Sequence, residues 1–458
     1  MTHLGKPMGV LALVAVASGL AVLHRPPAPR TDLTVWVFTE DEAATFREPA
    51  GGGRSLIEQF RQNTGKSVHV ELLAQRALDG RLMSLFLADD PAAEAPDLVE
   101  IDLGSVAKFL RPPTSDIGLL ALNPYLEESG DMQRLLPSRL VTWSKHGIIY
   151  GIPRDVHPVT LTYRNDLFDQ AGVDLESAGT WPRFQQACLA FQSYWSAHGQ
   201  PQRRAMELYT TQSEELLMIL LQRHINLVDD NGGIHLTDPG VAQTVAFYAQ
   251  LVAGPSQSTG IAADTIPGTP FGYRDLADGS ICAMFTPDWR TAYLKEYAPE
   301  LAGKLRMMPL PVFEAGDAPT STWGGTMIGI PRACKDPKAA WELLRFLCLG
   351  RTGLEARQAY SDIIPPVKEL WNDPIYQKGD PFFGGQAIDK LFISLARQIP
   401  SRCMTPLSIN AQSALTLVLN KAVSYANERG TDGLQDACAG WLKDADAELR
   451  EWLRQGEQ

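Results

Sequence analysis

The sequence predicts an α/β fold divided between two domains. The chain has 458 residues, which exceeds the size at which one hydrophobic core keeps growing. Its first part alternates short apolar strands with amphipathic helices, a pattern typical of a parallel sheet covered by helices. Hydrophobic residues make up 45% and charged residues 21% of the chain, which is ordinary for a folded globular protein and gives no indication of disorder.

The first 30 residues are typical of a targeting segment. Residues 8–23 carry no charged side chain, and a proline-rich stretch follows at 24–30. The apolar run is shorter than a spanning helix, and Ala-Val-Ala at 15–17 offers a small-x-small cleavage site, so we predict a secretory signal peptide. An uncleaved membrane anchor with a proline-rich spacer is the alternative. The segment has no cysteine, which excludes a lipoprotein anchor because there is no thiol to acylate.

Residues 31–38 (TDLTVWVF) alternate as a first strand, and 68–72 alternate as a second. Between them Ser55 is a candidate cap for a helix that Gly65 ends. A further amphipathic helix is predicted from the leucines at 78–86, and the alternation of strands and helices predicts a parallel sheet.

Carboxylates crowd the end of the first strand, where we expect a loop. Ligands in open α/β sheets gather beyond the carboxyl ends of strands, so Glu40 and Asp41 are candidates for binding hydroxyl groups. A solvated loop without a ligand is the alternative interpretation of each.

The segment 145–168 places a polar crossing between two short strands. Pro153 and Pro158 bracket it, and each favours an extended conformation in the residue before it. We expect a hinge here that offers polar side chains to a ligand. A surface hairpin with solvated charges is the alternative.

Three sequence runs carry a family resemblance. Tyr-Gly-Ile-Pro at 150–153, LTYRNDLFDQAGVD at 161–174 and TWPRF at 180–184 closely resemble the centre of the family 1 extracellular solute-binding proteins, the maltose-binding type that serve bacterial ABC importers. The resemblance implies a two-lobed periplasmic-binding-protein-like fold of type II, an α/β fold whose lobes are joined by hinge crossings. It also implies that the lobes close over a ligand.

The resemblance predicts the domain boundaries. Residues 1–30 precede the folded part as signal peptide or anchor. Lobe 1 is expected to comprise 31–153 and 323–365, and lobe 2 to comprise 154–322 and 366–458. Helices are expected in lobe 2 at 411–427 and 433–452.

The same resemblance implies which residues contact the ligand in the first half of the chain. By position after the Tyr-Gly-Ile-Pro strand, Arg154, Asp155 and His157 are candidates. His157 stands where maltose-binding members tend to carry an acid, which leaves the identity of the sugar open. Segment 95–102 resembles the third strand of the family, which carries an acid near its end, so Asp102 is a candidate ligand.

The remaining candidates are mainly aromatic. Segment 278–289 (DGSICAMFTPDW) resembles a family signature that ends in a tryptophan lying flat against the sugar, so Trp289 is expected to stack on the ligand. Trp323 is a second stacking candidate, and Gly324 and Gly325 beside it let the backbone approach a ligand and a hinge turn. Tyr209 is a further stacking candidate, with a core position as its alternative.

Composition and motifs argue against other classes. A net charge of −12 without a cluster of Lys and Arg argues against nucleic acid. The six cysteines form no CxxC pair, so we predict mostly buried free thiols and no metal site. No GxSxG, HExxH, P-loop or GxGxxG motif indicates catalysis. A glycosidase remains an alternative, with paired carboxylates drawn from Glu40, Asp41, Asp97, Glu100 and Asp102.

We therefore predict an exported, monomeric protein without a cofactor, periplasmic or at the cell surface, that closes over a sugar or oligosaccharide. It is expected to deliver this ligand to the permease subunits of an ABC importer. A binding protein for a non-sugar solute, such as a glycerol phosphate or a polyamine, is the first alternative. A membrane-tethered sensor is the second.

Overall fold

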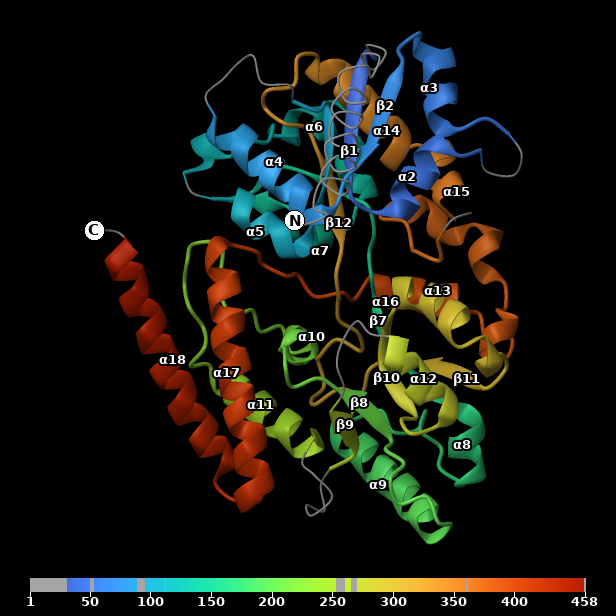
Figure 1. The fold of residues 1–458 in the computed structure, drawn as a ribbon, viewed down its shortest axis with the longest axis vertical. Helices are drawn as coiled ribbons and strands as arrows, with labels where there is room; N and C mark the ends of the chain where they lie inside the picture. The colour runs from blue at the N-terminus through green and yellow to red at the C-terminus, as the bar shows by residue number, and fades with distance from the viewer. Residues whose placement is uncertain are drawn as a thin grey trace, which may run out of the picture.

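The computed structural model describes residues 31–49, 53–88, 95–111, 113–252, 260–264, 270–358 and 361–456. The predicted signal peptide or anchor at 1–30 lies outside the described residues. The chain forms two lobes, which lie one above the other in Figure 1. Within the described ranges, no helix is long and apolar enough to cross a membrane.

A five-stranded sheet forms the centre of the first lobe. Its order is β2 (Val68–Leu72), β1 (Leu33–Val37), β3 (Leu98–Asp102), β12 (Thr326–Gly329) and β6 (Ile152–Pro153). Strand β1 pairs in parallel with β2 and β3, as predicted. The predicted parallel arrangement holds for these three strands, whereas β12, which comes from much later in the chain, runs antiparallel between β3 and β6.

Helices surround this sheet. They are α2 (Glu40–Arg47), α3 (Leu56–Thr64), α4 (Gln75–Leu87), α5 (Leu103–Phe109), α6 (Asn123–Ser129), α7 (Pro137–Thr142), α14 (Pro337–Cys348) and α15 (Arg351–Gln358). Ser55 caps α3 through a capping box, and Gly65 ends it with a φ of 76°, both as predicted. The loop expected after β1 is instead the start of α2, because carboxylates in a first helical turn are stabilised by the helix dipole.

The second lobe contains a separate antiparallel sheet. Strand β7 (Val159–Arg164) lies between β10 (Ala283–Pro287) and β11 (Leu305–Met308). Strands β8 (Met206–Leu208) and β9 (Ala262–Asp264) pair in parallel nearby. Every residue of β7 is buried, because helices and neighbouring strands cover both of its faces.

The helices of the second lobe include two long C-terminal ones. The set is α8 (Asn165–Gln170), α9 (Trp181–Ala197), α10 (Glu214–Gln222), α11 (Pro239–Val252), α12 (Pro270–Asp278), α13 (Asp288–Tyr297), α16 (Ile388–Ala396), α17 (Pro406–Arg429) and α18 (Leu434–Gly456). Helices α17 and α18 pack on each other and on α11 along one flank (Figure 1). Helix α17 begins earlier than predicted, because Thr405 forms a capping box ahead of its first-turn proline.

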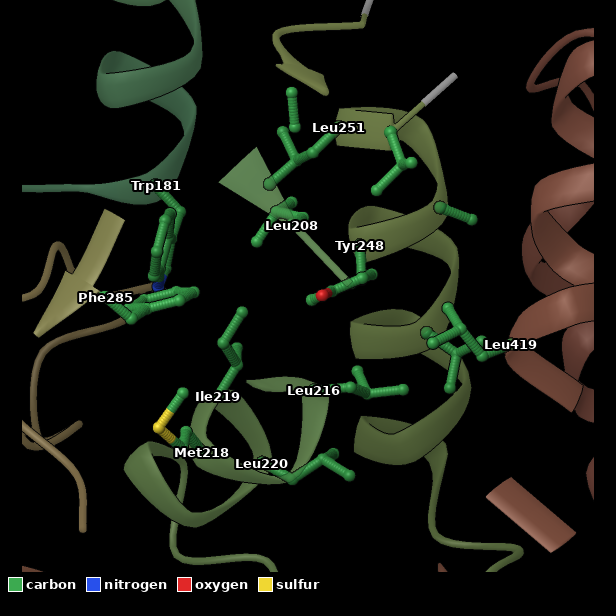
Figure 2. Packing of buried hydrophobic residues seen from close by; sticks show 14 of the residues in the cluster. Trp181, Leu208, Leu216, Met218, Ile219, Leu220, Tyr248, Leu251, Phe285 and Leu419 are labelled. Carbon is green, nitrogen blue, oxygen red and sulfur yellow. The ribbon is translucent and has the colours of Figure 1, made fainter. Parts of the chain in front are cut away.

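Apolar side chains hold the second lobe together. Trp181 of α9, Leu216 of α10 and Tyr248 of α11 converge in its core (Figure 2), and all three are fully buried. All six cysteines are free, and five of them are buried. They therefore serve as small apolar groups of the core, as predicted for most of them.

The described part of the chain passes between the lobes three times. The first crossing joins β6 to β7, the second joins β11 to β12, and the third follows α15. A buried apolar cluster is continuous from Val35 in the first lobe to Leu305 in the second. The lobes are therefore joined by packed side chains as well as by the three crossings.

Candidate ligand-binding cleft

A cleft with a volume of about 460 Å³ lies between the two lobes. The first lobe contributes the residues just after β1 and β3 and the first turns of α2 and α5. The second lobe contributes side chains from α10, α13 and α17, and all three crossings reach the cleft. Any ligand held there would contact both lobes and the segments that join them.

Most of the residues predicted from the sequence meet in this cleft. The lining includes Asp41, Asp102, Asp155, His157, Trp289, Trp323, Gly324 and Gly325. The predicted residues Glu40, Arg154 and Tyr209 do not line it. The sequence therefore predicted eight residues that line one cleft and three residues that lie behind or beside it.

Two indoles form the apolar wall of the cleft. Trp289, at the start of α13, and Trp323, in the second crossing, have ring centroids 5.7 Å apart and planes at 76°. The Nε1–H of Trp289 donates a hydrogen bond to the carbonyl oxygen of Trp323 at 3.0 Å. Both side chains are only partly buried, so the pair presents a rigid apolar corner to the cleft.

Carboxylates at the ends of β1 and β3 form the polar wall, but two of them also hold the backbone. Glu100 accepts hydrogen bonds from Phe38 N at 2.9 Å and from Thr39 Oγ1 at 2.9 Å. Burial raises the pKa of Glu100 to about 7, against the opposing effect of these donors. Asp102 caps α5 by accepting from Gly104 N and Ser105 N, each at 3.0 Å.

Arg357 is a cleft residue with unused hydrogen-bonding capacity. It comes from α15 and is 8% exposed, and its buried Nε and Nη1 make no hydrogen bond with the part of the chain that the structure describes. The nearest carboxylate oxygen recorded for it, on Glu42, is 3.6 Å from Nη1. Across from it, burial raises the pKa of Asp41, while the charge of Arg357 opposes the shift. The cleft therefore offers both donors and acceptors to a ligand.

The three predicted residues outside the cleft have structural partners or solvent around them. Arg154 forms a buried ion pair with Glu42 of α2, and burial lowers the pKa of Arg154 to about 9. Tyr209 is buried; its hydroxyl donates to Glu207 Oε1 at 3.2 Å, and its ring lies edge-on 6.4 Å from that of Trp323. Glu40 is exposed in the first turn of α2.

A buried ionic network underlies the first two crossings. Asp155 Oδ1 accepts from Arg139 Nη2 at 2.5 Å, and Asp155 Oδ2 accepts from Thr326 N at 2.8 Å. His157 Nε2 lies 3.2 Å from Asp155 Oδ2. Burial alone would raise the pKa of Asp155, but the charges of His157 and Arg139 outweigh it and hold this pKa below its ordinary value. Asp155 and His157 therefore hold the first two crossings together and also line the cleft.

Sequence reasoning missed several lining residues. Arg402 and Gln412 both bind Glu214, with Arg402 Nη1 2.6 Å and Gln412 Nε2 3.0 Å from its carboxylate oxygens. Tyr293 follows Trp289 by four residues, a helical spacing that could have indicated it. No local pattern around Arg357 points to the cleft.

Comparisons with known proteins agree with this architecture. Residues 55–382 match the bacterial extracellular solute-binding protein family. An arabinooligosaccharide-binding protein of Halalkalibacterium halodurans is 25% identical over 381 residues, covering 81% of this chain and 80% of that protein.

Solved structures show the same fold. The sugar-binding protein MalE from Xanthomonas citri superposes with a TM-score of 0.72 at 19% identity, covering 93% of this chain and 99% of that one. A transporter-associated binding protein from B. animalis subsp. lactis, in complex with beta-1,6-galactobiose, gives a TM-score of 0.63 at 18% identity over 92% and 98% of the two chains. The match over residues 55–382 establishes that this chain belongs to the bacterial extracellular solute-binding protein family.

Proposed function

We propose that this protein binds an oligosaccharide between its lobes and delivers it to an ABC importer. The observation that carries the proposal is the pairing of a two-indole corner with hydrogen-bonding groups in one cleft. A sugar ring has apolar C–H faces that pack on aromatic rings and a hydroxyl rim that needs donors and acceptors. Trp289 and Trp323 supply the first kind of surface, and Asp41 and Arg357 supply the second.

Each group has a separate role in this proposal. Trp289 and Trp323 stack on sugar rings. Asp41 accepts hydrogen bonds from hydroxyl groups, and the guanidinium group of Arg357 donates to hydroxyl oxygens. Because buried polar groups left unpaired are costly, a sugar that lacks a matching hydroxyl would bind more weakly.

Relatives support the oligosaccharide class. Two of them, in Halalkalibacterium halodurans and Bacillus subtilis, are named arabinooligosaccharide-binding proteins. Arabino-oligosaccharides are accordingly the first ligands to test. Malto-oligosaccharides and galactobiose come next, because sugar-binding proteins with this fold bind them.

Binding is coupled to closure in this proposal. In this proposal one lobe spans 31–153 with 323–365, and the other spans 154–322 with 366–458. A ligand that contacts both lobes stabilises the closed arrangement, because it gains contacts there that the open arrangement lacks. The N-terminal segment directs export of the protein in this proposal. Outside the cytoplasm, the closed monomer docks on the permease subunits at the membrane.

The test is a binding screen by calorimetry and thermal shift against sugars, glycerol phosphates and polyamines. We expect a sugar to raise the melting temperature, since a ligand at about 100 times its dissociation constant adds about 2.7 kcal/mol to the stability of the native state. Trp289→Ala should abolish sugar binding, whereas Trp452→Ala, which truncates an indole 54% exposed on α18, should not.

Other outcomes would redirect the proposal. Binding of a glycerol phosphate or a polyamine alone would retain the binding role and overturn the sugar assignment. Turnover of a glycoside that fails after Asp41→Asn would indicate a hydrolase. Mass spectrometry of the mature N-terminus distinguishes a secreted carrier from a tethered sensor, and a variant crosslinked closed that bound no permease would contradict delivery to an importer.

A further inference from the structure

An aromatic track leaves the cleft along one face of α13. Trp289, Tyr293 and Tyr297 recur every four residues, so they share a face of the helix. The rings of Trp289 and Tyr293 are 5.9 Å apart, and those of Tyr293 and Tyr297 are 6.0 Å apart with planes at 29°. The first two line the cleft and the third does not. The track therefore begins inside the cleft and ends outside it.

The outer two rings are open to solvent. Tyr293 is 42% exposed and Tyr297 is 46% exposed, so two neighbouring aromatic rings together form an exposed patch on α13. Tyr297 also packs near-parallel, at 5.7 Å, on the buried ring of Tyr273, which holds it in place. A ring that packs on a buried neighbour and is still nearly half exposed is preorganised as a stacking platform.

Carboxylates accompany the track at the mouth of the cleft. Asp41 of α2, on the opposite lobe, is close enough to interact electrostatically with Tyr293. Glu40 and Glu296 interact with Asp41 in the same way, so acids from both lobes gather here. In Figure 1, α13 lies at the edge of the second lobe that faces the first lobe. Aromatic faces beside hydroxyl-binding carboxylates match the chemistry of the cleft itself.

We propose that the binding site continues beyond the cleft along α13, with Tyr293 and Tyr297 forming an outer subsite for the distal units of a linear oligosaccharide. This inference rests on the proposed function. The inner units occupy the corner made by Trp289 and Trp323, and the outer units stack on the two tyrosines. The protein therefore distinguishes chains by length, and affinity rises with each unit until the track is covered.

The test compares binding of arabino-oligosaccharides, from the disaccharide to the hexasaccharide, by calorimetry on the mature chain. Tyr297→Ala should weaken binding of the longest chains about tenfold, because a stacked ring contributes up to about 1.5 kcal/mol. The disaccharide, held in the cleft, should bind with its affinity unchanged. Tyr297→Phe should retain the full affinity for long chains, because it keeps the ring.

Controls separate the outer subsite from the function as a whole. Trp452→Ala removes an exposed indole from α18 and should leave every affinity unchanged. If short and long chains bind the native protein but Tyr297→Ala changes neither, the outer subsite is overturned and the proposed function stands. If Tyr297→Ala weakens all lengths equally, the length selection is overturned. If no chain of this series or of a malto-oligosaccharide series binds, both proposals fall.

Discussion

Nδ1 of His157 lies 2.5 Å from Oδ1 of Asp288, and this contact fastens the first crossing to the start of α13. The other oxygen of Asp288 accepts a hydrogen bond from Ile364 N at 2.9 Å, in the third crossing. On its far side the imidazole faces Asp155, which holds Thr326 N of the second crossing. One imidazole between two carboxylates therefore connects all three segments that join the lobes.

We expect this contact to give a pH-dependent contribution to stability. Burial alone would lower the pKa of His157, but Asp155 and Asp288 outweigh it and raise the pKa to about 9. The cations that face these groups are Arg139, which binds Asp155, and Arg357, whose charge also lowers the pKa of Asp155. Because the folded pKa exceeds the unfolded value of about 6.5, the stabilisation is complete below about pH 6.5 and is lost as the pH rises through about 9.

Urea unfolding of the native protein and of His157→Gln at several pH values checks this expectation. The difference between their free energies of unfolding should be largest at about pH 6 and should shrink toward about pH 10. Taking the difference cancels the contributions of groups unaffected by the substitution, such as Glu100. A difference that stays constant over this range would show that the imidazole is not protonated in the native hinge.

Two neighbouring glycines in the second crossing should respond differently to substitution. A Cβ at Gly325 would lie 2.2 Å from Arg139 Nη2 and 3.0 Å from Asp155 Oδ1, whereas at Gly324 its nearest neighbour would be Trp289 Nε1 at 3.5 Å. Both residues have positive φ, which costs about 1–2 kcal/mol for an alanine. Thermal unfolding should therefore show a larger loss for Gly325→Ala than for Gly324→Ala. Equal losses would mean that backbone strain alone determines the effect.

Substitution of Glu42 should destabilise the fold more than substitution of Arg154, its partner in the buried ion pair. Glu42 also lies 3.6 Å from Arg357, so Arg154→Met leaves the carboxylate with one cation. Glu42→Gln instead leaves two buried guanidinium groups without their acid, which should cost about 3–5 kcal/mol of stability. Denaturant unfolding of both variants and of the double variant measures this. A larger loss for Arg154→Met would contradict the arrangement.

Arg357→Met should separate binding from stability. Nε and Nη1 make no hydrogen bond with the described residues, and Arg154 still pairs with Glu42 after the substitution, so the loss of stability should be smaller than for Glu42→Gln. Loss of a charged donor to a ligand should weaken sugar binding by about 1.5–3 kcal/mol. Calorimetry and thermal unfolding report the two effects independently. Arg351→Met, an exposed position on the same helix, is the matched control. A fall in melting temperature without a loss of affinity would assign Arg357 to the fold instead.

Local patterns were enough to predict the elements that local forces determine. The alternation in β1 and β2, and Ser55 and Gly65 at the two ends of α3, each depend on residues close together in the chain. The start of α2 was misread as a loop although its signal was present, since Glu40 and Asp41 are favourable residues for a first helical turn.

The rest depends on residues brought together only by folding. Arg154 was expected to face the ligand because it follows the Tyr-Gly-Ile-Pro strand, yet its side chain pairs with Glu42, in a helix far away in the sequence. Tyr209 is likewise drawn into the core by Glu207. Arg357 reaches the cleft because α15 packs against α2, a contact that no spacing in the sequence records.

Strand β12 has a consequence for how the chain is made. It lies between β3 and β6 in the sheet, although in the chain the strands of the second lobe's sheet come between β12 and both of these partners. The first lobe therefore cannot complete its fold as the ribosome produces it, and its central pairing waits until the chain reaches Gly329. Pairing between strands that lie this far apart in the sequence is slow. A chain that stopped earlier would leave β3 as an exposed edge, which is a template for aggregation, so truncation should not release a free-standing lobe.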